Sequence, residues 1–415
     1  MFRFCASMIL LVVTLELPAW VEAQSGLVPP QVAPREFAIM AWDSAPSDPE
    51  QLHSMKEAGL NIAGFCSVSD LDRVQAAQLS CFVEDARVSG YDWENLPAEN
   101  EIRSKMRDLA QLVERHTTVV GFFLRDEPRA PAMPGLGRVA NMLREVVPDT
   151  WPYVNLLAAY ASPARLGAAD YESYVRKLVE AVHPPFISYD NYSLVEGEMR
   201  DFFCTNLEIV RRVSLEAKIS FWNCVLANAH WNVMEPSDAT FNIQVYSTLA
   251  YGGRGIEYFT YFTPRQENYR MAAIDPFGYR TPTWDMMRRV NYQIHALAPA
   301  LIRLRSTGVY HSPEVPTGCR PLADSPLVKD VEMLTPSIVP MIRPRFLVGE
   351  FEDPQGRPYL MIVNKDLRYS FLYHPVFKKE VRKTFRISPY SGQEESLPQG
   401  YDWIAPGAGA LLRVE

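Results

Sequence analysis

Short apolar segments alternate with amphipathic segments between residues 36 and 264. The apolar segments are typical of strands buried on both faces, and each amphipathic segment that follows is typical of a helix with one apolar side. The apolar segments lie at 36–42, 61–66, 80–88, 119–124, 152–160, 185–193, 218–228 and 255–264. Eight strand-then-helix units in about 230 residues predict an α/β fold, a closed (β/α)8 TIM barrel, for which roughly 250 residues is typical.

An open, doubly wound sheet is the alternative arrangement of such units. That fold carries a glycine-rich phosphate-binding loop after its first strand. The corresponding residues here, 41–48, read AWDSAPSD and contain no glycine. The pattern therefore favours the closed barrel.

The pattern changes after a long amphipathic segment at 281–306. Prolines become frequent, and short strand-like runs follow at 345–353, 359–366, 383–389 and 408–415. Such runs predict a small antiparallel β-domain. We therefore divide the chain into a barrel at 24–305 and a C-terminal, β-sandwich-like domain at 306–415.

The first 23 residues follow a different pattern from the barrel. Arg3 precedes an apolar core, and the small-residue sequence VEA ends at Ala23. This layout predicts a secretory signal peptide that is cut near Ala23. Glu16 interrupts the apolar run, which disfavours a membrane anchor. We expect the mature chain to be exported to the periplasm or the extracellular space, without an integral membrane segment.

Composition narrows the classes of partner. The chain has 41 basic and 49 acidic side chains, a net charge of −8, and no basic run, which argues against nucleic acid as a partner. Its seven histidines are scattered without metal-ligand spacing, so we predict neither a metal site nor a cofactor. Five cysteines follow residue 23. Cys66 and Cys81 lie on adjacent predicted strands and could pair, but buried thiols are the preferred interpretation. The sequence does not indicate an oligomeric state.

Candidate chemistry gathers where the predicted strands end. Active sites of (β/α)8 barrels lie at the carboxyl ends of the strands, so polar residues there carry functional weight. The fourth strand ends in Arg125, Asp126 and Glu127, the third is followed by Asp85, and the sixth carries Asp190. The alternative to a catalytic role is a purely structural one, in which the charged side chains at the end of this strand form ion pairs with one another; these are Arg125, Asp126, Glu127 and Arg129.

Aromatic and amide side chains accompany these acids. Sugar rings stack on aromatic rings, and cleavage of a glycosidic bond requires a protonated carboxyl group together with a second group that stabilises or attacks the oxocarbenium-like centre. This combination predicts a carbohydrate substrate. The candidate substrate-binding residues are Trp42, Arg125, Tyr189, Tyr192, Trp222, Asn223, His230, Trp231 and Tyr261.

The eight-unit layout, the acidic end of the fourth strand and the run STLAYGGRGIEYFTYFTP at 247–264 resemble the (β/α)8 glycoside hydrolases of clan A. The eighth-strand run is similar to that of the family 42 β-galactosidases. The resemblance covers roughly residues 36–300. It implies that Glu127 is the acid/base and that Asp126 replaces the asparagine of the clan. The clan's nucleophile is a glutamate at the end of strand seven, and the matching run at 220–231, SFWNCVLANAHW, contains no acid.

Three alternatives can supply the missing group. Asp190 or Asp85 could be the nucleophile, or the base of an inverting mechanism, and this is the first choice. Asp126 could instead orient an N-acetyl group of the substrate that attacks internally, as the resemblance of the Asp-Glu pair to hexosaminidases implies. Glu257 ranks last because it precedes the strand end and lies deep in the barrel, where it could pair with an arginine. Retention and inversion both remain open.

Two functions are therefore carried forward from the sequence. The first is a secreted glycoside hydrolase acting on a poly- or oligosaccharide. The second is a carbohydrate-binding barrel that has lost catalysis, because strand seven lacks its acid.

Overall fold

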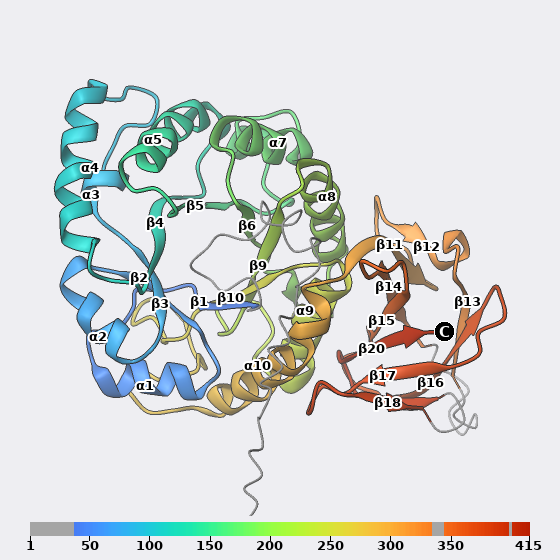
Figure 1. The fold of residues 1–415 in the computed structure, drawn as a ribbon. Helices are drawn as coiled ribbons and strands as arrows, with labels where there is room; N and C mark the ends of the chain where they lie inside the picture. The colour runs from blue at the N-terminus through green and yellow to red at the C-terminus, as the bar shows by residue number, and fades with distance from the viewer. Residues whose placement is uncertain (1–36, 334–343, 398–400) are drawn as a thin grey trace, which may run out of the picture.

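The computed structural model describes residues 37–333, 344–397 and 401–415, so the predicted signal peptide lies outside the described residues. Eight parallel strands close into a barrel ringed by helices (Figure 1), which confirms the predicted fold class and all eight apolar segments as strands. Each strand pairs with its neighbours in chain order, and β10 closes on β1. The barrel strands are β1 (Ala38–Ala41), β2 (Ile62–Cys66), β3 (Ser80–Val83), β4 (Val119–Asp126), β5 (Trp151–Leu156), β6 (Phe186–Asp190), β9 (Ser220–Leu226) and β10 (Gly255–Phe259).

Local capping chemistry sets where several helices begin. Asp48 accepts a hydrogen bond from the backbone N–H of Glu50 ahead of α1, and Ser237 forms a reciprocal capping box with Thr240 ahead of α9. The helices are α1 (Pro49–Glu57), α2 (Leu71–Ala76), α3 (Ala86–Ser89), α4 (Glu99–Val113), α5 (Met133–Val146), α6 (Pro163–Leu166), α7 (Tyr171–Val182), α8 (Phe202–Ala217), α9 (Asp238–Ala250) and α10 (Pro282–Leu301). Short 3-10 turns are η2 (Val68–Asp70), η3 (Ala130–Ala132) and η4 (Leu322–Asp324).

The interior of the barrel is filled by aromatic rings. Phe186 of β6 and Trp222 of β9 stack with their centroids 3.7 Å apart. Gly255 of β10 lies opposite this tryptophan, and a Cβ at position 255 would stand 2.4 Å from the indole ring. Only glycine leaves room for the ring, so β10 and β9 pack closely at this depth.

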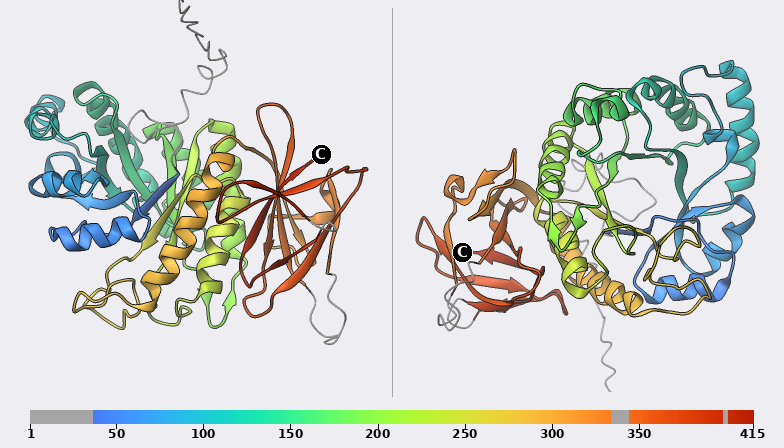
Figure 2. Two further views of the ribbon diagram at one scale, coloured as in Figure 1. Left: turned by 60° about the horizontal axis from the view of Figure 1, so that its bottom comes forward. Right: turned by 180° about the vertical axis from the view of Figure 1, so that it is seen from behind.

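The C-terminal part forms two sheets around a second core (Figure 2). One sheet has the order β12-β11-β14-β15-β20-β17-β18, and the other has the order β13-β16-β19. All of these pairings are antiparallel except β11 with β12, which confirms the predicted β-domain. Its strands are β11 (Arg305–Ser312), β12 (Arg320–Pro321), β13 (Val328–Met333), β14 (Phe346–Glu352), β15 (Pro358–Asn364), β16 (Phe371–Phe377), β17 (Thr384–Ile387), β18 (Glu394–Ser396), β19 (Asp402–Ile404) and β20 (Gly409–Val414), and a separate ribbon of β7 (Leu194–Val195) and β8 (Glu198–Met199) follows β6.

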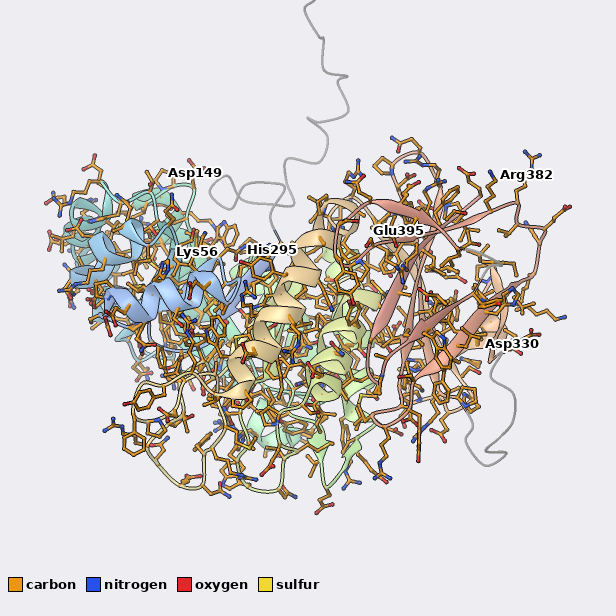
Figure 3. The ribbon with its side chains drawn as sticks, turned by 90° about the horizontal axis from the view of Figure 1, so that it is seen from below. Lys56, Asp149, His295, Asp330, Arg382 and Glu395 are labelled. Carbon is orange, nitrogen blue, oxygen red and sulfur yellow. The ribbon has the colours of Figure 1, made fainter. Side chains whose placement is uncertain are left out.

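The C-terminal domain docks on the barrel through α9, which packs against β14, β15 and β20. Gly349 of β14 touches the end of this helix, since a Cβ there would lie 2.1 Å from the carbonyl oxygen of Ala250. Nε of the buried Arg211 donates to Oγ of Ser306 across the same interface, at 2.9 Å. Arg382 and Asp330 lie on the far side of the C-terminal domain, away from the barrel (Figure 3).

The ring of helices closes where α10 meets α1. Nε2 of His295 on α10 lies 2.8 Å from the carbonyl oxygen of Gly59, which directly follows α1, and Figure 3 shows this histidine beside Lys56 of α1. Among the described residues, no helix combines the length and the apolar character needed to cross a bilayer. The five cysteines after residue 23 are unpaired thiols, and Cys66 and Cys81 make a hydrogen bond between adjacent strands instead of a disulfide.

Candidate active site

The carboxyl end of β4 turns sharply at Glu127. A bulge between Phe123 and Arg125 shifts the register of β4 against β5. Glu127 then adopts a φ of 43°, and its backbone N–H donates to the carbonyl oxygen of Asn155, 2.9 Å away. A positive φ is uncommon for a residue with a side chain and is found disproportionately at functional sites. The turn presents the carboxyl groups of Asp126 and Glu127 at the mouth of the barrel.

Asn155 of β5 ties two acids together. Its Nδ2 donates to Oδ1 of Asp126 at 3.1 Å and lies 3.4 Å from Oδ1 of Asp190 on β6. Asp190 also shares a hydrogen bond with the carboxyl group of Glu127. Three acids that the sequence singled out, Asp126, Glu127 and Asp190, therefore form one carboxyl cluster.

Burial changes the protonation of this cluster. It raises the pKa of Asp190 well above its usual range, and the charges of Glu127 and Asp126 raise it further. Burial likewise raises the pKa of Asp126 to about 6, against the hydrogen bond from Asn155. These effects favour the neutral form of Asp190, in which it can donate a hydrogen bond to Glu127.

Glu127 faces the opening. Its Oε2 accepts a hydrogen bond from Nη2 of Arg165, 2.7 Å away, and the arginine side chain is largely exposed. A carboxyl group that lies between an exposed guanidinium and a buried acid can receive a proton from that acid and pass it to a bound molecule. Within the described ranges, no group of three or more acidic, histidine or cysteine side chains is arranged to hold a metal ion.

A continuous aromatic wall lies beside the cluster and consists of Trp42, Phe259, Tyr192, His230 and Trp231. Phe259 of β10 joins Trp42 and Tyr192, with centroid distances of 5.9 and 5.3 Å. His230 continues the wall to Trp231, whose ring lies 5.0 Å away and is 63% exposed. Four predicted substrate-binding residues thus come together, and of these Trp231 presents an exposed face that suits a sugar ring, whereas His230 is only 3% exposed.

Tyr192 links the wall to the end of strand seven in the clan's order, which is β9. Its hydroxyl lies 3.7 Å from Sγ of Cys224, the buried β9 residue in register with Asp190. Burial raises the pKa of this thiol well above its usual range, so Cys224 is not an activated nucleophile. The described part of β9 carries no acid.

Two other predicted residues flank the cluster differently. Arg125 is exposed, and its charge lowers the pKa of Asp126. Asp85 caps α3 and forms a two-point ion pair with Arg87, at 2.8 and 2.7 Å. These hydrogen bonds lower the pKa of Asp85, and they occupy the oxygens that a nucleophile or base would use. This ion pair argues against the prediction that Asp85 is catalytic.

Four predicted substrate-binding side chains belong to the core. They are Tyr189, Trp222, Asn223 and Tyr261, each at most 3% exposed. Trp222 lies one inward-facing position deeper than Cys224, and Asn223 points outward to Thr248 of α9, at 2.8 Å. The hydroxyl of Tyr261 donates to Ser54 of α1. These positions correct the prediction that the four residues bind substrate.

Sequence reasoning missed three polar groups at the site. Asn155 interrupts an apolar strand, and a buried amide in such a strand is a signal that could have been used. Tyr160 follows the same strand and is 47% exposed, and partial desolvation of its hydroxyl together with the charge of Asp190 raises its pKa. Asp43 follows β1, and burial raises its pKa to about 6.

Asp126→Asn is expected to stabilise the protein at pH 7.5. The folded state favours the neutral form of Asp126, so this group contributes stability below its unfolded pKa of about 3.8 and loses it as pH rises through about 6. Because the group is partly exposed, we expect a gain of only about 1 kcal/mol from the neutral amide. Urea unfolding at pH 5 and pH 7.5 measures it.

Asp85→Asn provides the control of opposite sign. Its folded pKa is lowered, so the charged form stabilises the fold above the unfolded pKa, and the variant loses stability at pH 7.5. If Asp126→Asn instead loses stability at pH 7.5, the ionised carboxylate of Asp126 does not destabilise the folded state.

Searches against known proteins give the fold but no family: no family model matches the chain, and no curated protein matches it. Among solved structures, a β-galactosidase from Bacillus circulans sp. alkalophilus aligns over 91% of this chain and 99% of its own, at 8% identity and a TM-score of 0.60. A family 5 glycoside hydrolase from Bacteroides vulgatus aligns over 91% and 89%, at 11% identity and a TM-score of 0.54.

A β-galactosidase from the psychrophilic Marinomonas ef1 aligns over 65% of this chain, at 10% identity and a TM-score of 0.50, and the chain spans 62% of that protein's length. The expected likeness to β-galactosidase and clan A barrels is therefore confirmed at the level of the fold.

Proposed function

We propose that this protein is a glycoside hydrolase whose carboxyl cluster protonates the oxygen of a glycosidic bond. One observation carries the proposal: Asp190 is a buried acid whose neutral form is favoured, in hydrogen-bond contact with the more exposed Glu127, at the barrel end where such folds place their chemistry. The adjacent aromatic wall supplies apolar faces for a sugar ring. The fold shared with solved β-galactosidases supports the same function.

Proton delivery follows from the geometry. Asp190 and Glu127 share one proton, and Glu127 is the member of the pair that reaches the opening. When a sugar displaces Arg165 from Glu127, the proton passes through Glu127 to the leaving oxygen as the bond to the anomeric carbon breaks. Glu127 thus acts as the acid, and Asp190 keeps it supplied with a proton.

Asp126 acts on the sugar that develops positive charge as the bond breaks. With a pKa of about 6 it is ionised at neutral pH, so its charge stabilises the developing oxocarbenium ion or orients an N-acetyl group that attacks it. Asp190 and Glu127 share a hydrogen bond, whereas inverting enzymes leave about 6.5–9.5 Å between their carboxyl groups for a water. This contact argues against Asp190 as the base of an inverting mechanism and favours Asp126 or the substrate as the source of the attacking group.

We further propose that the protein acts after export, because residues 1–23 have the layout of a signal peptide. Fusion of these residues to a reporter enzyme tests this: export of the reporter supports it, and retention in the cytoplasm contradicts it.

Sugar release from a panel of poly- and oligosaccharides tests the function. The panel pairs substrates that differ only in a 2-hydroxyl or 2-acetamido group, and residues 24–415 are compared with Glu127→Gln. We expect release by the wild type and a loss of at least about 100-fold in the variant. Release confined to 2-acetamido substrates indicates substrate assistance. Binding without release by either protein would favour the carbohydrate-binding alternative.

A further inference from the structure

A second buried acid lies deeper in the barrel. Glu257 of β10 is fully buried. Its Oε1 accepts a hydrogen bond from the hydroxyl of Tyr153 on β5, and its Oε2 lies 2.8 Å from Oγ of Ser188 on β6. Among the described residues, none of the groups that perturb the pKa of Glu257 is a cation. The arginine partner considered from the sequence is therefore replaced by two hydroxyl groups.

Ser188 connects this acid to the carboxyl cluster. Its Oγ lies 2.8 Å from Oδ1 of Asn155. The amide nitrogen of the same asparagine donates to Asp126 and Asp190. An unbroken chain of hydrogen bonds thus runs from Glu257 through Ser188 and Asn155 to the site.

Counting hydrogens shows which form of Glu257 completes the chain. Four contacts, Tyr153–Glu257, Tyr153–Ser188, Glu257–Ser188 and Ser188–Asn155, each need one hydrogen, while the two hydroxyl groups supply only two. If Glu257 is ionised, Ser188 donates to it, and the Asn155 oxygen loses its donor. If Glu257 is neutral, it donates to Ser188 and Ser188 donates to Asn155, so both links between Glu257 and Asn155 are filled, Tyr153 donates to Glu257, and only the Tyr153–Ser188 contact lacks a hydrogen.

We propose that Glu257 is a positioning residue: it holds a proton and thereby keeps the Asn155 amide aimed at Asp126 and Asp190. The catalytic consequence rests on the proposed function, but the hydrogen-bond chain does not. When Glu257 loses its proton, Ser188 donates to Glu257 and no longer donates to the side-chain oxygen of Asn155. Leaving a buried amide oxygen without a hydrogen bond is unfavourable, which drives the amide to reorient.

The surroundings keep Glu257 neutral. The titratable groups that interact with it are Tyr153 of β5, Cys224 of β9 and Tyr189 of β6, and its register partner on β1 is the apolar Met40. Burial raises the pKa of Glu257 to about 7, opposed by its two hydrogen bonds. The proton is therefore lost just above neutral pH.

Carbon-13 NMR of protein labelled at the aspartate side-chain carboxyls tests the chain without any substrate. The hydrogen bond from Asn155 lowers the pKa of Asp126, so losing it raises the titration midpoint of that signal. Ser188→Ala is expected to raise the midpoint by about half a pH unit. Glu257→Gln keeps a donor for Ser188 and leaves the midpoint at its wild-type value. Tyr153→Phe removes a hydroxyl that contacts both Glu257 and Ser188. Neutral Glu257 can still donate to Ser188 and Ser188 to Asn155 in this variant, so we expect the midpoint to keep its wild-type value.

The proposal is overturned if the titration midpoint of Asp126 is unchanged in Ser188→Ala. It is also overturned if Glu257→Gln raises this midpoint as much as Ser188→Ala does. If Ser188→Ala does not fold, Ser188→Cys tests the same link with a weaker donor. With a hydrolysed substrate in hand, Glu257→Gln abolishes the fall in kcat that accompanies loss of the Glu257 proton above pH 7. If no glycoside is hydrolysed, the NMR titration still decides whether the chain exists.

Discussion

Replacing Asp190 with asparagine is expected to lower kcat for glycoside hydrolysis by about 10²–10⁴-fold. The amide preserves the shape of the side chain, and its Oδ1 still accepts from Asn155, so packing is retained. What the variant lacks is the proton that Asp190 shares with Glu127. Steady-state kinetics on the best substrate of the panel measures the effect, and KM is expected to change little because Asp190 is 8% exposed.

Asp85→Asn is the matched control for this loss. The sequence ranked Asp85 and Asp190 together as partners of Glu127, and the structure separates them, since Asp85 is bound to Arg87. We expect Asp85→Asn to keep kcat within about threefold, below the contribution of any general acid. A large loss in Asp85→Asn with an active Asp190→Asn would reverse the assignment.

Trp222→Ala is expected to cost about 3–5 kcal/mol in the free energy of unfolding, because it empties the space of a large ring in the barrel interior. The ring stacks on Phe186 and fills the space left by Gly255. The sequence assigned Trp222 to substrate binding. Its burial instead predicts an unchanged KM in the folded variant. Urea unfolding and kinetics of the same preparation measure both quantities.

Trp231→Ala is the matched comparison, because Trp231 is 63% exposed in the aromatic wall. We expect it to raise KM severalfold while leaving the free energy of unfolding within about 0.5 kcal/mol, as surface substitutions usually do. If Trp222→Ala does not fold, Trp222→Phe gives a smaller loss of stability. A raised KM in Trp222→Phe at unchanged stability would place this ring in the binding site after all.

The strands could be read from the sequence because parallel strands buried on both faces leave continuous apolar runs. Strand ends could be read as well, which is how Asp126, Glu127 and Asp190 were found. The sequence did not show which side chains face inward, because successive side chains of a strand alternate between its two faces. Of Tyr189 and Asp190 only one can point into the barrel, and both were predicted to be functional.

Depth was the second limit of the sequence analysis. Trp222 faces inward but lies below the mouth of the barrel, and its depth was not predicted from the sequence. Glu257 also lies below the mouth, and its depth was predicted because it precedes the end of its strand. The bulge in β4 and the positive φ of Glu127 place the cluster, and neither has a signature in residue type. The sequence shows that Asn155 is an amide in an apolar strand. It does not show which acids this amide contacts, because that depends on the register of β4, β5 and β6.

The account rests on one carboxyl group that keeps its proton at neutral pH. Carbon-13 NMR of protein labelled at the aspartate carboxyls measures this directly, with Asp190→Asn to assign the signal. We predict that one aspartate signal remains in its protonated position at pH 7.5, above the pKa of about 6 of Asp43 and Asp126, and disappears in the variant. If every aspartate is ionised by pH 7, Asp190 is not the proton store, and the proposed delivery through Glu127 is contradicted.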